Sequence, residues 1–125
     1  MESPTMLLES SILEDGTTVV SLQGRMDVSG TQEIELPLTT RTAISKAAII
    51  VDLSGVDFLA SIGLRALVSN AKAQELRGGR MVLCNPQPAV EKVLASTGID
   101  TIIPVFRTRS AAQEYLLPVL RKLRR

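Results

Sequence analysis

The sequence predicts one α/β domain with a single mixed β-sheet, an N-terminal β-hairpin and about four helices. An Asp15-Gly16 pair separates two apolar stretches near the N-terminus, and Asp-Gly in such a place is a strong hairpin signal. The stretch Ala47–Leu53 is apolar and β-branched in its middle, as expected for a strand buried on both faces. After it, helical and extended patterns alternate, which is typical of helices packed on one sheet.

The first part of the chain is expected to supply the hairpin and a less regular segment. We expect the two strands of the hairpin at Met6–Leu13 and Val19–Leu22, and we expect Gly24 to end the second one. Between residues 30 and 46 apolar residues can line one face of a helix, but Pro37 interrupts the pattern. Proline in a helix interior removes a hydrogen bond and crowds the preceding turn. We therefore expect a turn or short helix first, and then a helix that begins at or near Pro37.

The segment after the Ala47–Leu53 strand carries the clearest helical pattern. Ser54–Asp57 contains typical turn residues and is expected to turn the chain. From Ile62 to Arg77 apolar residues recur at i, i+3, i+4 and i+7, which predicts an amphipathic helix, and Gly78-Gly79 ends it. The residues expected on its buried face are Leu64, Leu67, Val68 and Ala71.

The remaining third of the chain alternates again between extended and helical patterns. We expect a strand at Met81–Cys84, a helix that begins at Pro88 and a short strand at Ile102–Phe106. A last helix is expected to begin with a capping box at Ser110, with a glutamine three residues later, and to be interrupted near Pro118.

Length and composition fit one domain and exclude several classes of function. The chain has 125 residues, with a core expected over roughly residues 6–117 and a basic C-terminal tail over residues 118–125. Aromatic residues make up 2%, which argues against a surface that stacks nucleic-acid bases. The net charge of +1 provides no field that attracts nucleic acid or membrane. No apolar run approaches the ~20 residues of a membrane helix, so we expect a soluble, cytoplasmic protein without direct membrane insertion.

The residue types needed for most catalytic and metal sites are missing. The chain has no histidine, which removes the usual metal ligand and the usual general base near neutral pH. Its one cysteine, Cys84, lies in an apolar strand and is expected to be a small buried residue. A serine nucleophile needs a base, and the basic group nearest in sequence to Ser61 is an arginine, which does not deprotonate a hydroxyl. We therefore predict a protein that is not an enzyme and that has no cofactor and no metal.

Four segments of the chain resemble the motifs of one protein family. The most informative runs from Val51 to Leu64: a buried strand, Asp52-Leu53-Ser54, a valine, a phenylalanine, then Ser61 before Gly63-Leu64. The segments Leu22–Asp27, Arg77–Leu83 and Val90–Gly98 match further motifs of this family in the same order. Together they resemble the STAS domain, shared by sulfate transporters and anti-sigma-factor antagonists, in its small bacterial form.

The resemblance implies a function as a protein-binding switch. In anti-sigma-factor antagonists the serine at the position of Ser61 is phosphorylated by a partner serine kinase, which is itself the anti-sigma factor. The unphosphorylated antagonist sequesters this kinase, and the phosphorylated form does not bind. Many switching members have Asp before the serine and Ser or Thr after it, whereas this chain has Ala60 and Ile62.

The resemblance also implies a partner-binding surface formed by two loops, Arg25–Ser29 and Asp57–Gly63, lying side by side. The residues placed on it are Arg25, Asp27, Asp57, Ala60, Ser61, Ile62, Gly63 and Arg65. From the residues alone, Asp27 fits equally well as a turn residue, and Arg65 as a solvated helix residue. Asp52 is expected to cap a turn, and Phe58 is expected in the core.

The residues around Ser61 give a physical reason for such a switch. Ser61 lies at or near the N-cap of the predicted helix, where serine is also a common structural cap. A phosphate there adds ~1.5–2 negative charges where the helix dipole and free amides favour an anion. Three alternatives remain open: a structural cap, a constitutive scaffold or regulatory subunit of a signalling or transporter complex, and a nucleotide-sensing module. A homodimer is also left open.

Overall fold

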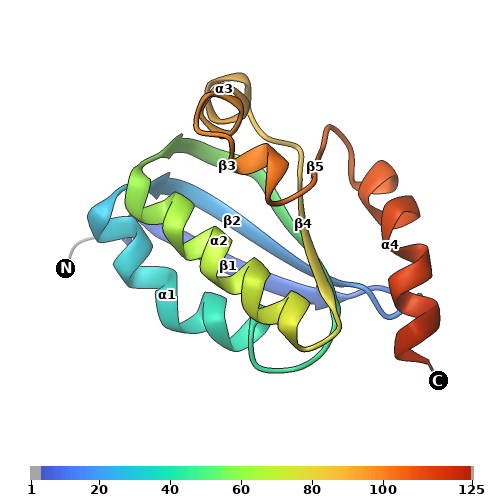
Figure 1. The fold of residues 1–125 in the computed structure, drawn as a ribbon. Coiled ribbons are helices and arrows are strands. Elements are labelled where there is room, and N and C mark those ends of the chain that lie inside the picture. Colours follow the sequence, from blue (N-terminus) through green and yellow to red (C-terminus); the bar gives the residue numbers. More distant parts are fainter. Residues whose placement is uncertain (1–3, 125) are drawn as a thin grey trace.

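A computed structural model describes residues 4–124, which form a five-stranded mixed sheet and four α-helices (Figure 1). The sheet order is β1-β2-β3-β4-β5, and β1 is antiparallel to β2 while the other neighbours are parallel. The predicted fold class is therefore confirmed. The elements are β1 (Met6–Ile12), β2 (Thr18–Met26), α1 (Val28–Thr42), β3 (Ala48–Leu59), α2 (Ser61–Leu76), β4 (Arg80–Cys84), α3 (Pro88–Ser96), a 3₁₀ turn (Ile99–Thr101), β5 (Val105–Phe106) and α4 (Arg109–Leu123).

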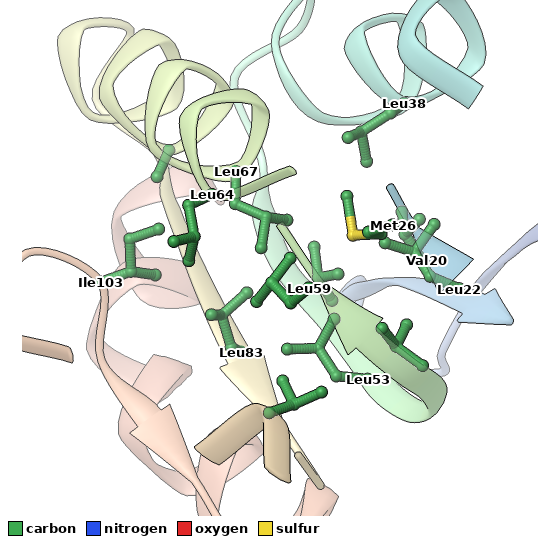
Figure 2. Close-up of a cluster of buried hydrophobic side chains, with 14 of the residues drawn as sticks. Val20, Leu22, Met26, Leu38, Leu53, Leu59, Leu64, Leu67, Leu83 and Ile103 are labelled. Atoms are coloured by element: carbon green, nitrogen blue, oxygen red, sulfur yellow. The ribbon is translucent and has the colours of Figure 1, made fainter. Parts of the chain in front are cut away.

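The central strand β3 is buried between two layers of helices. Ile49, Val51 and Leu53 lie in the larger core with α1, α2 and α3. Ile50 points to the opposite face, into a smaller core that α4 covers. Figure 2 shows Leu64 and Leu67 of α2 directed from the helix towards the strands. The continuous apolar pattern of this strand is explained by burial on both faces.

Helix α1 is continuous from Val28 to Thr42, so the prediction of a separate start near Pro37 is wrong. Pro37 is exposed, while Ile34 and Leu38 on either side of it are buried in the core. The hydroxyl of Thr42 donates to the carbonyl oxygen of Leu38 at 2.7 Å and adds a bond to the last turn. Packing on both sides of the proline therefore outweighs its local cost.

Helix α4 corrects three further expectations. Its N-cap is Thr108, whose hydroxyl accepts from the Ala111 amide at 3.1 Å, and not Ser110 with Gln113. It continues through Pro118 because Leu116 and Leu120 on either side are buried against the sheet. The core therefore extends beyond residue 117, and residues 118–123 belong to the helix; Arg125 of the predicted tail lies outside the described residues.

Strands β2 and β3 are longer than predicted. Gly24 does not end β2, and Ser54–Asp57 does not turn the chain, because the two strands stay paired as far as Met26 and Leu59. The pairing contains two register shifts, and Gly24 adopts φ +121° at one of them. Glycines that look like turn residues here mark irregular pairing inside a sheet. In contrast, β5 is shorter than predicted, because the amides of Ile102 and Ile103 both donate to the carbonyl oxygen of Ile99 and close the 3₁₀ turn.

Helix α2 matches its prediction closely. Leu64, Leu67 and Ala71 are buried, and Val68 is partly buried against the same core. Its buried Gln74 was not predicted: the side-chain amide donates to the carbonyls of residues 42 and 45, and its oxygen accepts from the residue 47 amide. Gln74 therefore ties the segment between α1 and β3 to α2.

Candidate functional site

Two strand–helix junctions lie side by side at one edge of the sheet. Met26 and Leu59, the last residues of β2 and β3, are paired in register, and the Ala60 amide donates to the Met26 carbonyl oxygen at 3.0 Å. The predicted loops are not loops: residues 25–26 and 57–59 belong to strands, and α1 and α2 begin at residues 28 and 61. Only Asp27 and Ala60 separate the elements, so the backbone at both junctions is fixed by regular structure.

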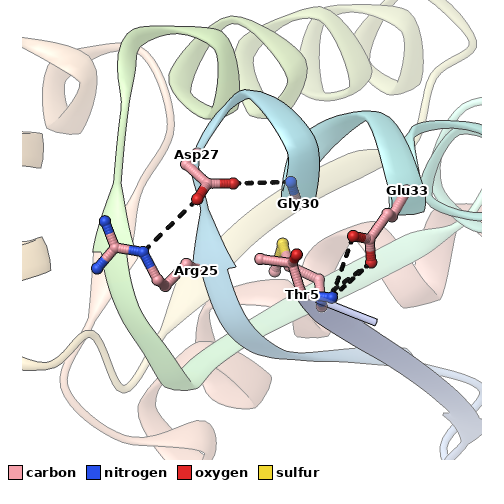
Figure 3. Close-up of polar contacts among 6 residues, drawn as sticks. Thr5, Arg25, Asp27, Gly30 and Glu33 are labelled. Atoms are coloured by element: carbon pink, nitrogen blue, oxygen red, sulfur yellow. Dashed lines mark hydrogen bonds and ion pairs between the residues drawn. The ribbon is translucent and has the colours of Figure 1, made fainter. Parts of the chain in front are cut away.

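The first junction is closed by the side chain of Asp27. Asp27 is the N-cap of α1, and its Oδ1 accepts from the Gly30 amide at 2.8 Å (Figure 3). Its Oδ2 forms an ion pair with Nε of Arg25 at 3.5 Å. A carboxylate in this position satisfies a free amide and interacts favourably with the helix dipole.

Phe58 is 39% exposed, so its predicted place in the core is wrong. Both Asp57 and Phe58 are exposed, and Leu59 is buried instead, because the register shift near this strand end breaks the in–out alternation. The guanidinium of Arg25 lies 4.2 Å from the centroid of the Phe58 ring. This cation–π contact adds an aromatic surface beside the junction.

The second junction has no side-chain cap. Ala60 is the N-cap of α2, with extended backbone angles, and within residues 4–124 no side chain bonds to the first turn of this helix. Ser61 is exposed and is the first residue inside the helix rather than its cap. The amides of residues 61–63 have no acceptor within the helix, so this end favours an anion.

Gly63 is buried and allows α2 to approach the strand ends. A Cβ atom there would lie 2.8 Å from Cδ1 of Leu59 and 3.0 Å from Cβ of Met26. Gly30 has the same role in α1, because a Cβ atom there would collide with the carbonyl oxygen of Arg25. Gly63, placed on the partner surface from the sequence, therefore positions Ser61 and offers no side chain to a partner.

A groove between α1 and α2 begins beside Ser61. Its hollow measures about 360 Å³. Half-buried Ile62 and exposed Arg65, both predicted as site residues, belong to its lining. The remaining residues that line it are Glu35, Thr39, Ala66, Ser69 and Asn70. These were not predicted, although the i, i+3, i+4 and i+7 spacing of residues 62, 65, 66 and 69 marks one side of a helix.

Glu33 fixes the start of β1 to α1, near the first junction. Its two carboxylate oxygens accept from the Thr5 amide at 3.0 and 2.7 Å, and one also accepts from the Met6 amide at 3.3 Å (Figure 3). Hydrogen bonding by Thr5, the largest cause, and by Met6 holds the pKa of Glu33 below its ordinary value. No sequence pattern indicated this contact.

The polar residues elsewhere are structural. Asp52 accepts from the Ser54 amide at 2.9 Å inside β3, where the chain does not turn, so its expected role as a turn cap is wrong. Its Oδ2 lies 3.6 Å from the guanidinium of Arg109. Cys84 is buried, and burial, followed by the charge of Asp52, raises the pKa of its thiol to about 12.

Within residues 4–124 no three His, Cys, Asp or Glu side chains are grouped so that they would hold a metal ion. No helix in that part of the chain has the length and apolar character needed to cross a membrane.

Comparison with known proteins identifies the family. The family model described as the STAS domain matches residues 12–112. The chain belongs to the STAS domain family. BtrV of Bordetella bronchiseptica, named as an anti-sigma factor antagonist, is 31% identical over 98 residues, which cover 78% of this chain and 84% of BtrV.

Solved structures agree with this assignment. The STAS domain described above superposes on the crystal structure of an anti-sigma factor antagonist from Mycobacterium paratuberculosis with a TM-score of 0.81 and 26% identity, covering 93% of this chain and 98% of that one. The fold also matches the Bacillus antagonist SpoIIAA in its unphosphorylated form, with a TM-score of 0.70, 23% identity, and coverage of 87% and 95%.

Proposed function

We propose that this STAS domain is an anti-sigma-factor antagonist that binds an anti-sigma factor serine kinase and is released from it by phosphorylation of Ser61. The names of its relatives support the class of function. The observation that carries the switch is the exposed Ser61 at the start of a helix that lacks a side-chain cap. A cytoplasmic location, expected from the sequence, is part of the proposal.

The surface proposed for the kinase surrounds both junctions. Arg25, Asp27 and Phe58 supply charged and aromatic groups at the end of β2 and β3. Asp57 adds a carboxylate at the end of β3. The surface continues onto the start of α2 through Ala60, Ser61, Ile62 and Arg65, whereas the buried Gly63 only lets this helix approach the strands. The backbone of these residues is already held in strands and helices or at the one-residue junctions between them, so binding orders little additional chain.

Phosphorylation would change the charge of this surface without disturbing the fold. Ser61 is exposed, so a phosphate needs no internal space. The free amides of the first turn of α2 favour the added ~1.5–2 negative charges. A kinase surface complementary to a neutral hydroxyl would then have to bury an unpaired dianion, which is costly.

The chemistry of the transfer would come from the kinase. The chain has no histidine, and Ser61 acts only as the acceptor. The bond between the β,γ-bridging oxygen of ATP and the γ-phosphorus breaks, and a new bond forms between that phosphorus and Oγ of Ser61. ADP leaves with the electron pair, and the hydroxyl proton passes to a base supplied by the kinase.

Phosphate mapping tests this function. The protein is incubated with ATP and with each candidate anti-sigma kinase of its source organism, produced as pure protein, and the products are analysed by mass spectrometry. We expect one phosphate, on Ser61, and none in the Ser61→Ala variant. Modification of Ser29 or Ser69 alone, which are also exposed on α1 and α2, would contradict the assignment.

A further inference from the structure

The groove between α1 and α2 continues the surface around Ser61. Ile62 follows Ser61 directly and lines the end of the groove nearest the junction. Val28 of α1 is 56% exposed and lies two helical turns before Glu35, on the same side of that helix. An apolar side chain in the first turn of each helix, Val28 in α1 and Ile62 in α2, therefore lies between the junctions and the charged part of the groove.

Opposite charges face each other across this groove. Glu35 lies on the α1 wall and Arg65 on the α2 wall, and both are exposed. Within residues 4–124 neither forms a salt bridge, whereas Arg25, Glu91 and Arg109 each do. The lining also includes the apolar side chains of Ile62 and Ala66. A protein segment with the complementary pattern would satisfy all of these groups together.

We propose that this groove receives a segment of the anti-sigma factor that places an apolar side chain against Ile62 and Ala66, an acidic residue against Arg65 and a basic residue against Glu35. This inference rests on the proposed function. A standard interface buries ~800 Å² on each partner, and the two junctions alone are short. The groove supplies the additional area, and its charges set which kinases bind.

Arg65 links the groove to the modification site. It follows Ser61 by four residues in α2, a spacing at which helical side chains are neighbours. A phosphate on Ser61 would attract the Arg65 guanidinium and weaken its pairing with the acidic residue of the kinase segment. Phosphorylation would therefore act on the groove as well as on the serine itself.

Three groove variants with matched controls test the proposal. Arg65→Glu and Glu35→Lys reverse one charge each, and Ser69→Leu fills the groove without changing charge; all three residues are exposed. Lys92→Glu and Ala95→Leu make the same kinds of change on exposed positions of α3, away from the groove. Dissociation constants are measured by calorimetry with each purified candidate anti-sigma kinase, after circular dichroism has shown that every variant folds.

We expect each groove variant to weaken binding of the kinase by about tenfold or more, and each α3 control to leave it unchanged. If Ser61→Asp weakens binding but the groove variants bind like wild type, the groove proposal is wrong and the proposed function stands. If no kinase binds wild type, both are wrong. If wild type forms dimers that the groove variants dissociate, while affinity for the kinase is unchanged, the groove holds a second copy of this chain and the proposal is overturned.

Discussion

The two helices that begin at the edge of the sheet share one design and differ in how their first turns are capped. Asp27-Val28-Ser29-Gly30 starts α1, and Ala60-Ser61-Ile62-Gly63 starts α2. In both, a glycine in the third helical position lets the helix rest on the end of β2. Asp27 caps α1 with its carboxylate, whereas Ala60 has no group to offer. The first turn of α1 therefore already has a side-chain acceptor, and the first turn of α2 is left available for an anion.

The shared glycines are the part of this design that tolerates change least. In Gly30→Ala the new methyl group would meet the backbone oxygen of Arg25, which cannot move aside. We expect the free energy of unfolding to fall by about 3 kcal/mol. In Gly63→Ala the nearest atom is the end of the Leu59 side chain, so a loss of about 1–2 kcal/mol is expected. Urea unfolding measures both, and equal losses would contradict the difference between the two contacts.

The capping difference predicts unequal effects of removing the polar side chain at each helix start. Asp27→Ala removes the hydrogen bond to the Gly30 amide and should lower the free energy of unfolding by about 1 kcal/mol. Ser61→Ala should change it by less than about 0.5 kcal/mol, because Ser61 is not a cap. Thermal unfolding at fixed pH compares them. A loss for Ser61→Ala as large as that for Asp27→Ala would show that its hydroxyl does cap α2.

Giving α2 the cap that α1 already has should stabilise the protein. In Ala60→Asp the carboxylate would accept from the Gly63 amide, as Asp27 does from Gly30. We expect the free energy of unfolding to rise by about 0.5–1 kcal/mol, measured by urea unfolding. Ala60→Asn separates the hydrogen bond from the charge. A loss of stability in both variants would mean that the first-turn amides of α2 are not available.

The pH dependence of stability should show the contact that supports the first junction. Because the pKa of Glu33 is lowered in the folded state, its contribution is present above the ordinary value of about 4.3 and is lost as the pH falls through the folded value. Glu33→Gln should therefore melt below wild type near pH 6, and the difference should shrink below about pH 4. Glu35→Gln removes a charge from the same helix as a control. A difference between wild type and Glu33→Gln that does not vary with pH would contradict the assignment.

The sequence predicted those elements whose buried face shows as a regular spacing of apolar residues within one short segment. The apolar run of β3 and the periodicity of α2 were assigned correctly because each reports the faces of one element. Pro37 and Pro118 were misjudged because their local cost is outweighed by packing with distant strands. The residues at the end of β3 predict a turn, because the pairing with β2 that keeps them extended is not local in the sequence.

The residues at and around the candidate site also fall into two groups, those that the sequence predicted and those that depend on contacts with distant parts of the chain. The family resemblance located Ser61 and Asp27, and the structure gave them different places relative to their helices. Glu33 and Gln74 were missed because their hydrogen-bond partners lie 28 and 32 residues away in the sequence. Glu35 was missed because only the packing of α1 beside α2 brings it opposite Arg65.

The affinity of the anti-sigma kinase for four forms of the protein tests the switch most directly. Wild type, Ser61→Ala, Ser61→Asp and the Ser61-phosphorylated protein are compared at one salt concentration, because screening changes every charged contact. We expect wild type and Ser61→Ala to bind equally, Ser61→Asp more weakly, and the phosphorylated protein most weakly, since a phosphate carries ~1.5–2 charges. Equal affinities for all four forms would contradict the account, because the charge at the uncapped start of α2 would then have no effect on binding.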